Sequence, residues 1–234
     1  MPLTLGPKET QAPALDNAAR APVAWWKLDE TEGTAAADAT AHRPAARIQG
    51  TPRWTAGQGR HGGALALDGA QNLVDCGGGA DFDFRSALTV SLWVKPGEPK
   101  KRSQTLIAKG NDTWRLQSAG ENGGFVFALS GPGTTGKDRK KAPRAASKRA
   151  LDDGQWHHLL GVYDGQRIAF YVDGALEDSV AASGPLSLNT EPVWLGNNSS
   201  ARGESFQGSL DDVRLYRCSL SEGEIKALYR GEGK

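Results

Sequence analysis

The chain has very little of what marks several protein classes. Its 234 residues include two cysteines, one methionine and no long apolar run. A membrane-spanning helix needs about 20 consecutive apolar residues, so we expect no membrane span. Two cysteines cannot make a zinc site by themselves and do not make a disulfide-rich scaffold. From their number alone, one disulfide and two free thiols both remain open.

The chain also has almost no excess charge of either sign. Its formal net charge is +1. Nucleic-acid partners normally require a clearly basic domain, so we expect none. One stretch is locally basic, with seven positive residues against a single aspartate: Lys137, Arg139, Lys140, Lys141, Arg144, Lys148 and Arg149. This basic patch could bind a sulfated glycan or an acidic partner, or it could be a solvated loop.

Glycine, proline and tryptophan are plentiful instead. Thirty glycines, twelve prolines and seven tryptophans are typical of many short strands joined by turns, which predicts an all-β protein. Such domains often reach about 200–250 residues, so we expect one large domain at 23–234. Residues 1–22 are rich in alanine and proline and lack the apolar core of a signal peptide. We interpret them as a flexible linker.

Period-two alternation predicts the strands. In residues 88–95, Val90, Leu92 and Val94 share one face, which predicts that they are core residues. The same alternation predicts four further core residues: Phe170, Val172, Val213 and Leu215. The runs 156–163, 166–172 and 175–181 are separated by Asp-Gly pairs, the pattern of tight hairpin turns. They predict an antiparallel meander.

Other segments complete the expected layout. Further strands are predicted at residues 25–28, 64–67, 72–75, 104–109, 114–117, 125–129, 193–196 and 209–216. More than ten strands require two sheets. The capping-box spacing of Ser221 and Glu224 predicts one short helix at 221–229. Residues 131–150 have no apolar periodicity, and we interpret them as a long basic loop inserted between two strands.

Seven motifs occur in an order that resembles the laminin-G-like jelly roll of the concanavalin A-like lectin/glucanase superfamily. They are residues 25–30 with Gly33, 64–69, 88–94, 154–159, 163–165, 169–174 and 206–216, followed by the helix at 220–229. The resemblance covers roughly residues 23–230. It implies a two-sheet antiparallel jelly-roll sandwich with one short C-terminal helix. It also implies a secreted, periplasmic or cell-surface location, because such modules usually occur in exported bacterial or extracellular proteins.

The same resemblance implies a structural calcium ion. In related jelly rolls, calcium commonly joins the first strand and its following loop to the last strand. Carried over to this chain, the ligands are Asp211 with Asp29 or Asp38. Calcium prefers several oxygen ligands, which carboxylates can supply. The alternative is that these acids simply face water.

Candidate catalytic residues are scarce. Glucanases of this fold carry alternating acids on one strand, because two carboxylates must flank the glycosidic bond. The pair Glu177-Asp178 is adjacent rather than alternating, and Gly-x-Ser-x-Gly is missing from the sequence. His157 and His158 are neighbours in a strand, point to opposite faces and cannot chelate one ion together. We therefore expect no enzyme.

Candidate ligand-binding residues lie near the predicted strand ends. Sugar sites combine an aromatic platform with amide and carboxylate groups, because a sugar has an apolar ring face and a rim of hydroxyls. The set comprises Trp54, Trp114 and Trp194 with Asn111, Asp112, Asn197 and Asn198. Core packing of the tryptophans is the alternative.

Together these features predict a non-catalytic binding or adhesion module within an exported multidomain protein. Its ligand would be a carbohydrate or an extracellular protein. The rival hypothesis is a glycan-processing enzyme of the same fold with an unrecognised active site. Because an exported location is oxidising and each cysteine follows a strand, we also predict a disulfide between Cys76 and Cys218.

Overall fold

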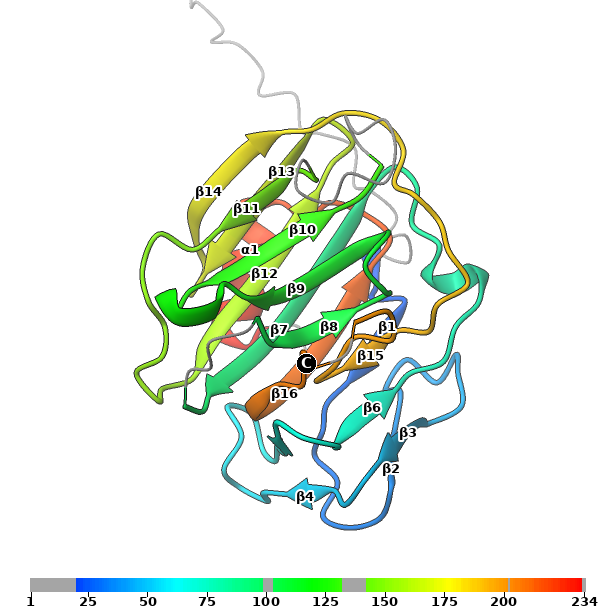
Figure 1. The fold of residues 1–234 in the computed structure, drawn as a ribbon, viewed down its shortest axis with the longest axis vertical. Coiled ribbons are helices and arrows are strands. Elements are labelled where there is room, and N and C mark those ends of the chain that lie inside the picture. Colours follow the sequence, from blue (N-terminus) through cyan, green and yellow to red (C-terminus); the bar gives the residue numbers. More distant parts are fainter. Residues whose placement is uncertain (1–19, 99–102, 132–141, 202, 233–234) are drawn as a thin grey trace, which may run out of the picture.

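Two antiparallel sheets of eight strands each pack face to face (Figure 1). This is seen in a computed structural model, which describes residues 20–98, 103–131, 142–201 and 203–232. The two-sheet sandwich expected from the alternation of apolar residues is confirmed.

Sheet A has the strand order β14-β13-β12-β7-β16-β5-β4, with β1 also paired to β16. Its strands are β1 (Ala24–Trp26), β4 (Arg53–Trp54), β5 (Leu65–Asp68), β7 (Leu88–Pro96), β12 (His157–Tyr163), β13 (Arg167–Val172), β14 (Ala175–Ala181) and β16 (Gln207–Tyr216). The first and last strands of the chain are therefore neighbours in one sheet.

Sheet B has the order β11-β10-β9-β8-β15-β6-β3-β2 and faces the viewer in Figure 1. Its strands are β2 (Ala35–Ala36), β3 (Ala46–Gln49), β6 (Leu73–Asp75), β8 (Thr105–Ala108), β9 (Trp114–Ser118), β10 (Phe125–Leu129), β11 (Arg144–Ala146) and β15 (Trp194–Leu195). Two short 3-10 turns, η2 (Ala80–Phe82) and η3 (Gly120–Asn122), lie in the connections.

The main core lies between the sheets. All seven residues predicted from alternation belong to it, and none is more than 1% exposed. The sheets pack tightly at Gly161 of β12, where an added Cβ would lie 2.3 Å from a ring carbon of Phe127 on β10. Contact this tight leaves no room for a side chain at that position.

The predicted meander is confirmed as β12-β13-β14. Its second turn is the two-residue loop Asp173-Gly174, in which both residues have positive φ, of 52° and 77°. This is the backbone of a type I′ hairpin turn, which aspartate tolerates and glycine adopts without strain. The Asp-Gly pair therefore sets the register next to the turn, and a bulge between Phe170 and Tyr171 shifts it farther along the hairpin.

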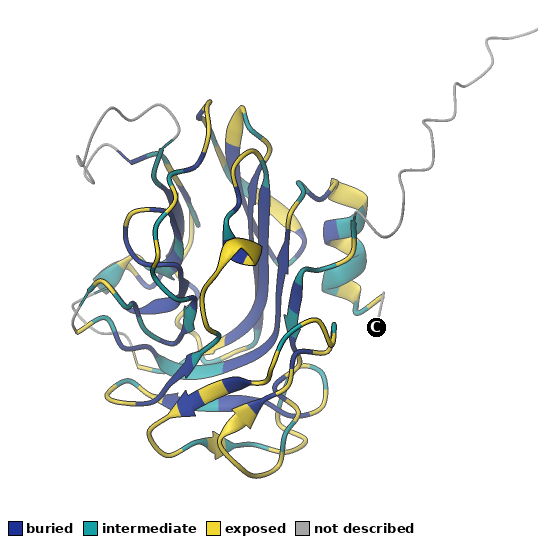
Figure 2. Ribbon diagram, turned by 90° about the vertical axis from the view of Figure 1, so that its right-hand side faces the viewer, coloured by how far each residue is buried: buried dark blue, intermediate teal, exposed yellow. Residues whose placement is uncertain are grey.

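The predicted helix is α1 (Glu222–Arg230), and it covers part of the outer face of sheet A (Figure 2). The Ser221 side chain accepts a hydrogen bond from the Glu224 N–H, which completes the capping box. Ile225 is fully buried in a second, smaller apolar cluster with Leu160 and Tyr171 of sheet A. A helix of nine residues depends on such packing, because short isolated helices are marginal in water.

Three expectations need correction. Part of the segment 131–150 is the edge strand β11, which escaped the periodicity argument because only its middle residue, Ala145, enters the core. Of residues 1–22, the structure describes 20–22, and Arg20 pairs with Glu224 of α1. The predicted disulfide is wrong, because both cysteines are free: Cys76 packs against the core between the sheets, whereas Cys218 packs outside sheet A beside α1.

Candidate functional site

An irregularity in the last strand shapes the most unusual polar site. The register between β16 and β7 shifts between Asp211 and Arg214. At this bulge Asp212 has φ of +50°, a left-handed conformation that costs a non-glycine residue about 1 kcal/mol or more. Bulges often redirect side chains next to functional sites. Here the bulge holds two consecutive aspartates in the sheet.

Asp211 is fully buried, with 0% of its surface exposed. Its Oδ2 accepts a hydrogen bond from the His61 N–H at 2.8 Å. Its Oδ1 is buried and has no hydrogen-bond partner among the described residues. Burial raises the pKa of this carboxyl to about 7, and the negative charges of Asp212 and Asp29 add to the effect. A buried carboxylate oxygen without a donor is costly unless a cation or a proton satisfies it.

Asp29 approaches the same place from the loop after β1. Its Oδ1 accepts a hydrogen bond from the Gly63 N–H at 2.6 Å. A Cβ added to Gly62, whose φ is +79°, would lie 2.4 Å from that oxygen, and one added to Gly59 would lie 2.9 Å from Asp211 Oδ2. Only a glycine-rich turn can therefore fit between the two carboxylates.

The two acids line one cavity of about 210 Å3, together with Trp25, Lys27, His61, Gly62 and Asp212. The described residues contain no group of three His, Cys, Asp or Glu side chains suited to a metal. A metal here would therefore take two carboxylates and complete its shell with backbone carbonyls and water. Such an all-oxygen set suits calcium, a hard cation with six to eight oxygen ligands.

The other two acids near this cavity have structural partners. Asp212 accepts two hydrogen bonds from the Arg214 guanidinium, at 3.0 and 3.1 Å, and one from the Trp25 indole. Asp38 accepts hydrogen bonds from the N–H groups of Trp25 and Thr40, each at 3.0 Å. Of the two alternatives for the partner of Asp211, the structure thus places Asp29 at the cavity, while Asp38 is occupied in its own turn.

Among the predicted sugar-binding residues, the three asparagines form hydrogen bonds within the protein. Asn111 and Asn198 are brought together, because the Asn198 side chain donates to Asn111 Oδ1 at 2.7 Å, and Asn197 donates to Ser205. Both Asn111 and Asn198 are buried, so they hold the loop after β15 to the turn before β9. Asp112 is exposed at that turn.

The prediction is wrong for Trp114 as a sugar platform. Its side chain is 1% exposed and packs in the core, with its ring 6.1 Å from that of Phe84. It shares its face of β9 with Leu116, which also points inward. Trp194, by contrast, points outward from sheet B and is half-buried.

The basic patch is only partly described. Lys137, Arg139, Lys140 and Lys141 lie outside the described residues. Arg149 is held by two acids of the β13–β14 hairpin, Asp173 and Glu177, both at 3.0 Å. Arg144 is exposed on β11, and Lys148 is exposed beyond it. Of the three described basic residues, Arg149 therefore already has acidic partners, whereas Arg144 and Lys148 are exposed.

The two histidines occupy opposite faces, as predicted. His157 contacts Asp173 at 2.9 Å and Asp153 at 3.1 Å, and these hydrogen bonds, led by that to Asp173, raise its pKa. His158 contacts the Ser91 hydroxyl at 2.9 Å, and burial lowers its pKa to about 4. Ser91 and His158 are each only 2% exposed, so this serine–histidine pair is out of reach of a substrate.

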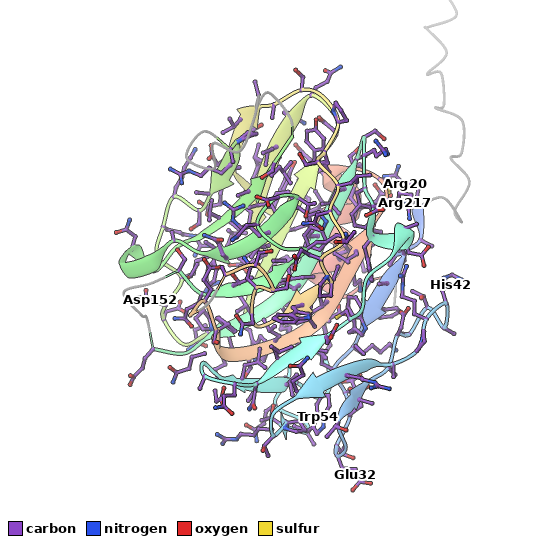
Figure 3. The ribbon with its side chains drawn as sticks, turned by 45° about the vertical axis from the view of Figure 1, so that its right-hand side comes forward. Arg20, Glu32, His42, Trp54, Asp152 and Arg217 are labelled. Atoms are coloured by element: carbon purple, nitrogen blue, oxygen red, sulfur yellow. The ribbon has the colours of Figure 1, made fainter. Side chains whose placement is uncertain are left out.

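Sequence reasoning missed the turn at residues 59–63, which supplies N–H donors to both acids of the cavity. The only signal was its three glycines, Gly59, Gly62 and Gly63, which are also typical of an ordinary surface turn. A second, larger cavity of about 500 Å3 lies beside α1, on the side where Arg20 and His42 are labelled in Figure 3. Its walls are largely apolar, with Trp25, Tyr216 and Leu228 among them.

Comparison with known proteins identifies the family. The model described as the concanavalin A-like lectin/glucanases superfamily, Laminin_G_3, matches residues 68–226. The chain belongs to this superfamily. Among curated relatives of this superfamily member, Danio rerio adhesion G-protein coupled receptor V1 is 28% identical over 157 residues, covering 63% of the chain and 2% of the receptor. Homo sapiens laminin subunit alpha-3 is 35% identical over 118 residues, covering 45% of the chain and 3% of the laminin subunit.

Solved structures share the fold along most of this laminin-G-like chain. Domain 4 of AbnA, a GH43 extracellular arabinanase from Geobacillus stearothermophilus solved with arabinotriose, superposes with a TM-score of 0.71 at 19% identity, over 90% of this chain and 99% of that domain. The binding domain of Paraclostridial Mosquitocidal Protein 1 gives 0.68 at 16% identity, over 90% of this chain and 52% of that one. Within the described residues, no helix is both long and apolar enough to cross a membrane.

Proposed function

We propose that the chain is a non-catalytic carbohydrate-binding module of an exported multidomain protein. The observation that carries the proposal is the match along 99% of a domain whose structure contains arabinotriose and which belongs to an extracellular enzyme. The chain spans only 2–3% of the two curated relatives described above. A module of this size would therefore be one part of a longer protein, as in those relatives.

We further propose that calcium joins the first and last strands of the module. Asp211 and Asp29 would hold the ion, and the buried Oδ1 of Asp211, which has no hydrogen-bond partner among the described residues, would gain a ligand. Calcium would then bind the folded state only and stabilise it by mass action. The calcium ion would stabilise the fold and would not need to contact the bound sugar.

A glycan-processing enzyme is the second candidate, and one observation favours it. Asp211, whose pKa is raised to about 7, shares a cavity with Asp29, and glycosidases use a pair of carboxyls with separated pKa values. Full burial argues against it, because a general acid must reach the glycosidic oxygen of its substrate. A buried carboxylate that binds a metal ion does not need to reach a substrate.

A glycan array tests the proposal. The protein is applied with calcium to arabinan-derived, other neutral and acidic oligosaccharides, and the retained sugars are then incubated with it and analysed by mass spectrometry. The proposal predicts retention of a defined group of glycans, which are recovered intact. Cleavage would favour the enzyme. Retention of no glycan, together with capture of a purified extracellular protein, would favour a protein ligand and contradict the proposal.

A further inference from the structure

A lysine is fully buried away from the polar cavity of Asp211. Lys109 comes directly after β8, and its side chain is among the largest that the fold buries completely, with 1% of its surface exposed. Lysine is rarely buried without partners, because its ammonium group is costly to remove from water. The groups around its Nζ atom are therefore what makes this burial possible.

Two residues from distant parts of the chain meet this Nζ atom. Asn189, in the connection from β14 to β15, is 80 residues away in the sequence, and its backbone carbonyl and its Oδ1 accept hydrogen bonds from Nζ at 2.7 and 3.2 Å. Asp83, directly after η2, places its Oδ1 3.3 Å from Nζ, and this oxygen is itself buried. An amine, a carboxamide and a carboxyl group thus meet at one buried point.

Both partners are held in place by the fold. Asp83 stands between two phenylalanines of the main core. The connection that carries Asn189 runs past η2 in Figure 1, and its Leu186 N–H donates to the Arg85 carbonyl at 2.8 Å. Groups that are already positioned against one another react without the entropy cost of bringing them together.

The Asn189 carboxamide is fixed through both of its polar atoms. Its Nδ2 donates to the Lys109 carbonyl at 3.1 Å, and its Oδ1 accepts the Glu191 N–H at 3.1 Å. Donors aimed at Oδ1 stabilise negative charge that develops there, as in an oxyanion hole. The carbon bonded to this oxygen, Cγ, is the electrophile that an amine can attack.

We propose that Lys109 and Asn189 form an intramolecular amide (isopeptide) bond, with Asp83 as the proton carrier. Asp83 takes a proton from the ammonium group, which frees the lone pair of Nζ. The lone pair forms a bond to Cγ of Asn189, and the electron pair of the C=O bond moves to Oδ1. Asp83 then gives a proton to Nδ2, the C=O bond re-forms, and the Cγ–Nδ2 bond breaks.

The reaction balances without an oxidant, a reductant or another reagent. Nζ gives up two protons in turn to Asp83, and Asp83 passes one of them to Nδ2. The products are the new amide, ammonia and a protonated Asp83, so the chain loses one NH3, about 17 Da. The bond would tie the end of β8 to the connection before β15 and close a loop of 80 residues.

Mass spectrometry of the denatured full chain tests the proposal. The wild type should be about 17 Da lighter than its sequence. A tryptic digest should contain residues 103–115 joined to residues 168–202, uncut after Lys109. Fragmentation of the joined peptides should place the link between Lys109 and Asn189.

Two variants should abolish the link. Lys109→Arg keeps the positive charge but removes the nucleophile, because a guanidinium stays protonated, and Asp83→Asn removes the proton carrier. Both should have the full mass of their sequences. The matched controls Lys95→Arg and Asp81→Asn change exposed residues and should keep the loss of NH3. Because closing an 80-residue loop restricts the unfolded chain, both unlinked variants should melt about 10 °C below the wild type.

Other outcomes would overturn the inference. A folded wild type that keeps the full mass of its sequence after prolonged incubation at neutral pH would contradict it, and this measurement depends on no variant. Loss of NH3 at Asn189 without a joined peptide would mean that the backbone, and not Lys109, attacked the side chain. A link that forms equally in Asp83→Asn would contradict the role of Asp83. None of these results bears on the proposed carbohydrate-binding function.

Discussion

Replacing Asp211 with asparagine should stabilise the protein more in chelator than in calcium. The substitution keeps the shape of the side chain and its acceptor for the His61 N–H, and removes the buried charge. In chelator, we expect Asp211→Asn to be more stable than the wild type at pH 8. In saturating calcium, only the wild type should gain stability, because the amide cannot replace a carboxylate ligand.

The magnitude follows from the pKa of the carboxyl. A value raised from 3.8 to about 7 corresponds to at most about 4 kcal/mol, at about 1.4 kcal/mol per pH unit. Because the folded state binds this proton more tightly, wild-type stability should fall as the pH rises from about 4 to about 7 and then level off. Calcium at a hundredfold excess over its Kd should return about 2.7 kcal/mol to the wild type, which narrows its difference from Asp211→Asn.

The assay is urea denaturation of the wild type, Asp211→Asn and the control Asp152→Asn, in calcium and in chelator, between pH 4 and 8. Asp152 is exposed and does not line the Asp211 cavity, so its variant should follow the wild type in both conditions. His158, whose pKa is lowered to about 4, also makes the free energy of unfolding depend on pH. Because all three proteins contain His158, subtracting their free energies of unfolding removes this contribution. The reasoning is refuted if Asp211→Asn is less stable than the wild type in chelator and calcium stabilises neither.

Two further predictions concern the fold. Gly161→Ala should lower the free energy of unfolding by about 1–3 kcal/mol in denaturant titrations, because the new methyl group meets the Phe127 ring. Gly223→Ala, with nothing within 4 Å, should not, and an equal loss in both would contradict the packing argument. His157→Gln should cost more stability at pH 6 than at pH 9, since a histidine pKa raised by Asp173 stabilises the fold below 6.5 and loses that effect as the pH rises through the raised value. A pH-independent cost would contradict this.

Strands and core could be predicted because burial imposes a period of two on the sequence. Val90, Leu92 and Val94 needed only their alternation with polar neighbours to be assigned to the core. The same rule, applied to Trp114 and Leu116, would have placed that tryptophan inside. The sugar-platform prediction failed because it considered residue type and ignored the face.

The edge strand β11 and the polar cavity could not be predicted in this way. β11 has three residues, too few for a period, and only Ala145 enters the core. The cavity joins Asp29, the turn at 59–63 and Asp211 across long stretches of chain. Resemblance suggested the two acids, but only three-dimensional packing brings the turn to them.

The central claim, that the chain binds carbohydrate without cleaving it, is tested most directly by 15N-HSQC titration with arabinotriose and with a heparin tetrasaccharide. We predict that at least one of them shifts a defined set of backbone amides in a saturable way, and that mass spectrometry recovers the sugar intact. Cleavage of either sugar, or spectra that neither sugar changes, would contradict the account.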